Sequence, residues 1–107
     1  MQLARLAPAA SHDNHYANWG MGHSIRTGLI VPGRLTRESM LDAIDRRAVF
    51  ASEDQNLEVR LYAEDRVRAG SELRTLDDEV VLDLYLADPN YRGTYAVTVY
   101  RCTVGGD

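Results

Sequence analysis

The stretch that decides the fold is residues 26–52, RTGLIVPGRLTRESMLDAIDRRAVFAS. Its first six residues are strand formers, and they end at Pro32 and Gly33, a pair typical of a turn. Thr36 then suits a helix N-cap, and a helix of about 12 residues is predicted to follow it. Residues 49–52, VFAS, form a second short run of strand formers. The order predicts a β-α-β unit, in which a crossover helix makes the two strands parallel.

The predicted helix carries several local signals. Leu35 and Met40 occupy the two positions of a hydrophobic staple, and Glu38 places a negative charge in the first turn. Asp42 and Arg46 are spaced for an i,i+4 ion pair. One face carries four apolar residues at helical spacing: Met40, Leu41, Ile44 and Ala48. A single helix covers only part of one face of a parallel sheet, so the unit needs more sheet or a partner.

From Leu57 onward the apolar residues follow a period of two, which is typical of half-buried strands. Such alternation runs through residues 57–62, 80–87 and 95–100, and a further short strand is expected around Val67. These runs predict antiparallel neighbours in a small sheet or sandwich. We therefore expect an α+β fold in one domain over residues 1–107, with one main helix in a β-α-β unit followed by the mostly antiparallel sheet or sandwich.

The composition narrows the class of protein. The chain has 107 residues, 45% of them hydrophobic and 26% charged, with a formal net charge of −4. It has no apolar stretch near the roughly 20 residues of a membrane helix and no cationic stripe for nucleic acid. The first ten residues lack the apolar block of a signal peptide, so we expect a cytoplasmic protein. A single cysteine, Cys102, excludes a disulfide framework and a thiolate zinc cage.

Chemistry is expected in the loop between His12 and Ser24, which is dense in Asn, Gly and His. Asp13 and His15 form an Asp-x-His pair, whose side chains leave an extended chain on the same side. Imidazole and carboxylate are ligands of zinc, manganese and iron, and water bound to such an ion becomes a nucleophile. Two ligands do not make a site, and adding His12 or His23 only reaches the lower limit. The alternative is a polar loop whose histidines face solvent.

Several short elements, in order, give the chain a family resemblance over residues 11–62: Asp13-x-His15, Asn18-Trp19-Gly20, Arg26-Thr27, Leu35-Thr36-Arg37-Glu38 and Ala51-Ser52-Glu53-Asp54. Together they resemble the closing part of the PHP superfamily (polymerase and histidinol phosphatase), closest to its carbaryl-hydrolase-like branch. The resemblance implies that Asp13 and His15 are metal ligands and that residues 11–54 form the last β/α unit of a barrel. Residues 55–107 would be a β-rich appendage. In that family a cluster of two or three ions activates water against phosphoester or related bonds.

The family's other ligands are an early His-x-His, a glutamate and further histidines, all upstream of this segment. Only ten residues precede Ser11. We therefore expect a C-terminal fragment with little or no independent catalysis, truncated or complemented by another polypeptide, and a weak or absent metal in the isolated chain. His12 is expected to be a neighbouring polar residue. The alternative function is a non-catalytic β-rich interaction module that forms a homo-oligomer or binds a protein partner.

Each of the other candidate residues has two possible roles. Arg26 could bind a substrate phosphate bidentately, or pair with a carboxylate as a structural arginine. Trp19 could stack on a ligand, but packing in the core is expected. Four tyrosines could form a binding surface or pack at strand edges with wet hydroxyls: Tyr85, Tyr91, Tyr95 and Tyr100. Glu53 and Asp54 are adjacent, so they are expected in a turn rather than in an acid and base pair.

Overall fold

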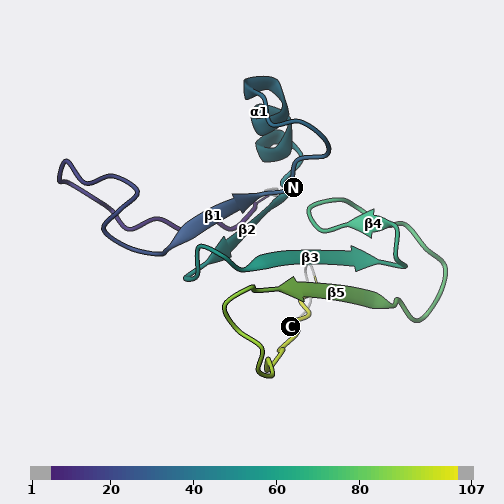
Figure 1. Ribbon diagram of the computed structural model, residues 1–107. Helices are drawn as coiled ribbons and strands as arrows, with labels where there is room; N and C mark the ends of the chain where they lie inside the picture. Colours follow the sequence, from purple (N-terminus) through teal and green to yellow (C-terminus); the bar gives the residue numbers. More distant parts are fainter. Residues whose placement is uncertain (1–5, 104–107) are drawn as a thin grey trace.

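In the computed structural model residues 6–103 form one helix and five strands (Figure 1). The structure describes residues 6–103; residues 1–5 of the stretch considered for a signal peptide, and residues 104–107 of the expected domain, lie outside it. The elements in chain order are β1 (Arg26–Leu29), α1 (Arg37–Asp45), β2 (Val49–Ser52), β3 (Glu58–Ala63), β4 (Val67–Arg68) and β5 (Leu82–Ala87). The α+β class expected from the sequence is confirmed.

The first sheet contains β1 and β2, which pair antiparallel, with Arg26 opposite Ser52 and Leu29 opposite Val49. The expected parallel crossover is therefore wrong. The strands are antiparallel because α1 lies at the end where β1 finishes and does not cross the sheet (Figure 1). The chain thus enters β2 beside the end of β1, and the Ile30 N–H donates to the Ala48 carbonyl at 2.8 Å.

Helix α1 begins as predicted and ends early. The Thr36 side chain accepts from the Ser39 N–H at 3.0 Å while the Ser39 hydroxyl accepts from the Thr36 N–H at 2.8 Å, a reciprocal capping box. At the other end Arg47 has a φ of 57°, and the Ala48 N–H donates to the Ala43 carbonyl. This Schellman turn closes the helix after nine residues instead of about 12. The Asp42–Arg46 ion pair forms at 2.9 Å.

The second sheet has the strand order β4-β3-β5, all antiparallel. Strands β3 and β5 pair along six residues, from Glu58 opposite Ala87 to Ala63 opposite Leu82. Between β3 and β4, Glu64 and Asp65 both have positive φ, and the Arg66 N–H donates to the Ala63 carbonyl, as in tight hairpins. The expected antiparallel neighbours and the short strand at Val67 are confirmed here.

Residues 95–100, expected as a strand, lie outside both sheets of the described chain. The segment before them folds on itself. The Tyr91 N–H donates to the Asp88 carbonyl, the Tyr91 hydroxyl donates to the Thr94 carbonyl, and the Tyr91 and Tyr95 rings lie edge to face 5.2 Å apart. Because these contacts keep the chain near the end of β5, residues 95–100 do not run back along that strand.

The core is very small. Among the described residues only Ala43, Ala48 and Ser52 are buried. The helix turns Ala43 inward, whereas Leu41 and Ile44 of the expected core face are each 55% exposed. That expectation was wrong for the larger side chains, because the described chain has no layer that covers them. No helix in residues 6–103 is long and apolar enough to cross a membrane.

Candidate functional site

The Asp-x-His pair lies in an irregular segment that leads into β1. Asp13 has a φ of 47°, so the chain bends there. The segment is therefore not extended, although an extended chain was expected to place the Asp13 and His15 side chains on the same side. Both side chains are exposed, and the Nδ1 of His15 lies 2.7 Å from the carbonyl oxygen of Asp13. A carbonyl can only accept, so Nδ1 carries the proton and Nε2 is left as the basic nitrogen. This is the usual arrangement of a histidine that ligates a metal through Nε2.

The loop after the pair is held by short-range hydrogen bonds. The Asn14 side chain accepts from the Tyr16 N–H at 2.7 Å and donates to the Asn18 side chain at 3.0 Å. The expected core residue Trp19 is 74% exposed in this loop. That prediction was wrong, because the loop extends away from both sheets (Figure 1). The loop's shape therefore comes from polar contacts and not from packing.

Arg26, at the start of β1, is the residue that ties the loop to the sheet. Its guanidinium donates to the carbonyls of His23 and Ile25, both at 2.7 Å, and to that of Gly20 at 2.9 Å. A fourth bond, at 3.3 Å, reaches the side chain of Gln55. Among residues 6–103 the guanidinium therefore contacts backbone carbonyls and an amide instead of the carboxylate partner of the structural alternative, and the phosphate role stays a prediction. In this geometry its donors position the loop backbone.

The same loop brings two histidines together. The rings of His12 and His23 have centroids 5.5 Å apart and are tilted by 49°. The Nδ1 of His12 is buried and has no hydrogen-bond partner. No three His, Cys, Asp or Glu side chains among residues 6–103 are grouped closely enough to hold a metal ion. The donors in this region are therefore two sets, the Asp13–His15 pair and the His12–His23 pair.

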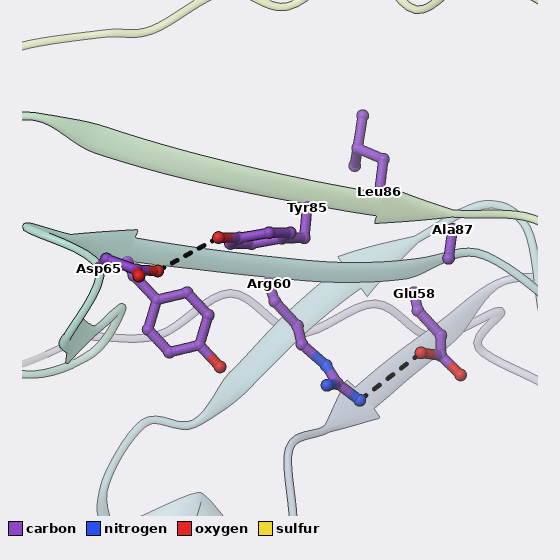
Figure 2. A pocket seen from close by; sticks show the side chains of 7 residues that line it. Glu58, Arg60, Asp65, Tyr85, Leu86 and Ala87 are labelled. Atoms are coloured by element: carbon purple, nitrogen blue, oxygen red, sulfur yellow. Dashed lines mark hydrogen bonds and ion pairs between the residues drawn. The ribbon is translucent and has the colours of Figure 1, made fainter.

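A second candidate lies on the three-stranded sheet, in an open hollow of about 460 Å³. Figure 2 shows Tyr85 reaching Asp65 and Arg60 reaching Glu58, with Leu86 on the other side of β5. The Tyr85 hydroxyl donates to the Asp65 carboxylate at 3.1 Å, and this bond, with the nearby negative charge, raises the pKa of Tyr85 above 10.0. These residues were not predicted as a site from the sequence. The only indication in the sequence was the polar turn expected at residues 63–66, which places Asp65 next to the sheet.

Comparisons with protein-family models, with curated proteins and with solved structures find no significant match to this chain.

Proposed function

We propose that this chain is the closing segment of a PHP-like metal-dependent hydrolase of the phosphoesterase type. On its own it has little or no activity, and another polypeptide segment completes it. The proposal combines the resemblance over residues 11–62 with one observation on the folded chain, its uncovered surface. The completing segment would supply the missing ligands and cover the apolar side chains.

The accessible surface carries the proposal. A compact folded protein of 12.0 kDa exposes about 6,000 Å². This chain exposes 9465 Å², and its radius of gyration is 16.1 Å against about 13 Å for a compact domain of this length. The surplus, about 3,500 Å² on this chain alone, is at least as large as the roughly 1,000–2,500 Å² that one partner buries in an obligate complex. A chain with this much uncovered surface is expected to have a permanent neighbour.

The helix is one place where that neighbour would sit. Leu35, Leu41 and Ile44 are exposed on and beside α1, although the spacing of the apolar residues is that of a buried face. An amphipathic helix without a second layer favours a covering polypeptide. Because β1 and β2 are antiparallel, only β1 would join a parallel barrel, with β2 turning away from it.

The Asp13–His15 pair fits the proposed metal role in its donor chemistry. The Nδ1 of His15 is engaged by a backbone carbonyl, which leaves Nε2 for an ion, and the Asp13 carboxylate is exposed in the same loop. A zinc, manganese or iron ion held here with further ligands would supply a nucleophilic water for phosphoester hydrolysis. Arg26 would keep the ligand loop on β1 rather than bind the phosphate itself.

Metal analysis of the purified chain tests the ligand assignment. We expect the wild type to hold more zinc, manganese or iron per chain than Asp13→Ala/His15→Ala, by a substoichiometric amount. The double variant should keep its circular dichroism spectrum, because both side chains are exposed. Equal metal in both proteins would contradict the assignment.

A self-associating, non-catalytic module is the second candidate, and residues 95–100 favour it. This segment alternates like a strand, and Val97 and Val99 are exposed and unpaired in the described sheets. Strand formers next to an open sheet edge promote pairing between copies. Light scattering tests it: we expect a dimer or larger oligomer that Val97→Lys/Val99→Lys dissociates, and a strictly monomeric wild type would contradict it.

For either function, a cytoplasmic location remains a prediction.

A further inference from the structure

We propose that His12 and His23 are two ligands of a site for a divalent transition-metal ion, distinct from the Asp13–His15 pair. The ion is of the kind that prefers imidazole, with zinc as the representative case. Water or donors from a covering polypeptide would fill the remaining positions. The inference goes beyond the proposed function, because it rests on other side chains and needs no hydrolase.

The spacing of the two rings fits a shared ion. With Zn–N bonds of about 2.0–2.1 Å and tetrahedral angles, two imidazoles on one zinc have centroids about 5 Å apart. The observed distance between the centroids of His12 and His23 is 5.5 Å, and the rings are tilted by 49° instead of stacked in parallel. His23 is exposed, so its ring has room to turn toward an ion shared with His12.

The state of His12 also indicates a missing partner. Its Nδ1 is buried without a hydrogen bond, and a buried polar atom left in this way is destabilising. His15, the other histidine beside it in the sequence, has its Nδ1 satisfied by the Asp13 carbonyl. Of these two neighbours, His12 is the one whose ring nitrogen is left to be satisfied by an ion.

Arg26 gives the pair its rigidity. The guanidinium holds the His23 carbonyl at 2.7 Å and the Gly20 carbonyl at 2.9 Å, so the backbone that carries His23 is fixed to β1. The segment before His12 is fixed to the same strand, because the Ala10 N–H donates to the Thr27 hydroxyl at 2.9 Å and the Ala10 carbonyl accepts from it at 2.9 Å. Both ligands are thus tied to β1, and ligands held in place before binding favour affinity.

The three histidines of the chain allow a matched test by calorimetric titration of the full 107-residue protein with Zn²⁺. We expect one tightly bound ion per chain in the wild type, besides the weak, substoichiometric binding proposed for Asp13 and His15. His12→Ala and His23→Ala should each lower the Zn²⁺ affinity by at least about tenfold, the scale on which even outer-shell partners act. His15→Ala and Asp13→Ala should change it less than about threefold. In ¹⁵N NMR spectra, Zn²⁺ should shift the ring nitrogens of His12 and His23 and leave those of His15.

Three outcomes would overturn the site. If the protein bound no Zn²⁺, His12 and His23 would form a contact between rings and not a metal site. Equal losses from all three histidine variants would indicate non-specific surface binding. A loss confined to Asp13→Ala and His15→Ala would reject the His12–His23 site while supporting the ligands of the proposed hydrolase, so the two proposals fail separately. A circular dichroism spectrum for each variant ensures that folded proteins are compared.

Discussion

The two halves of the molecule are stabilised in different ways. In the half formed by β3, β4 and β5, a backbone ladder of six residue pairs joins residues 19 to 29 positions apart in the sequence. In the half formed by β1, α1 and β2, the ladder has four residue pairs, and the buried residues are two alanines and a serine. The caps, the ion pair and three of the four Arg26 bonds there are short-range. The comparison teaches that the sheet half depends on its longer backbone ladder and the helix half on local caps and bonds, and that neither half buries a large side chain among residues 6–103.

The largest expected effect is at Gly70, where the two halves meet. Arg47 donates from its guanidinium to the Gly70 carbonyl at 2.6 Å, and a Cβ on Gly70 would overlap the Arg47 carbonyl oxygen. Gly70 also has a φ of 89°, which side chains disfavour. We expect Gly70→Ala to lower the free energy of unfolding in urea by about 3 kcal/mol, combining backbone strain and overlap.

Gly33→Ala is the matched control for that prediction. Gly33 has a similar φ of 78°, but a Cβ there would meet nothing within 4 Å. Only the backbone term applies, so we expect a loss of about 1 kcal/mol. Equal losses at Gly33 and Gly70 would mean that the contact between the halves contributes nothing.

The next effect separates the halves. Thr36→Ala removes the acceptor for the Ser39 N–H at the start of α1, and N-cap losses of this kind cost about 1 kcal/mol. By hydrogen exchange, we expect faster exchange at the amides of α1 and unchanged protection in β3 and β5. If the β3 and β5 amides lost protection equally, the two halves would unfold as one unit. That result would contradict the view that the two halves are stabilised separately.

The sequence predicted what local rules determine. The N-cap at Thr36, the ion pair at Asp42 and the alternation in residues 57–62 and 80–87 depend on neighbouring residues, and the structure has the cap, the ion pair and strands β3 and β5. The direction of β2 depends on where α1 settles in space, which no local spacing encodes. Likewise residues 95–100 have the right alternation, but their pairing depends on the contacts of Tyr91 and Tyr95.

The candidate site shows the same division. That the loop at residues 12–24 carries the chemistry remains a prediction, as does the assignment of Asp13 and His15 as ligands. The contact between His12 and His23 spans ten intervening residues and depends on the backbone bonds of Arg26, so the sequence did not distinguish it. A substrate role for Arg26 also remains untested, and its observed partners favour positioning.

A smaller effect is expected from the ion pair within α1. Asp42→Asn removes the charge that Arg46 contacts at 2.9 Å, and because both side chains are largely exposed we expect a loss of about 0.4 kcal/mol in thermal unfolding. The loss should disappear in 1 M NaCl, since salt screens exposed pairs. Asp45→Asn, on the same helix, controls for the removal of a negative charge near its C-terminal end. An equal change in both variants would argue against the pair.

The smallest effect is a titration in the sheet half. Asp65 accepts the Tyr85 hydrogen bond and its charge opposes phenolate, so the pKa of Tyr85 lies above 10.0 in the folded chain. A raised folded pKa gives stability that is fully present below the unfolded value and is lost as pH rises through the folded one. We therefore expect no change at neutral pH, and Asp65→Asn should lower the pKa of Tyr85 in an NMR titration of its ring. Asp88→Asn, which is not among the groups acting on Tyr85, should leave that pKa where it is. If Asp65→Asn also left it unchanged, the turn at residues 64 and 65 would not hold its carboxylate against the sheet, and the sheet half would be less ordered at its edge than its backbone ladder implies.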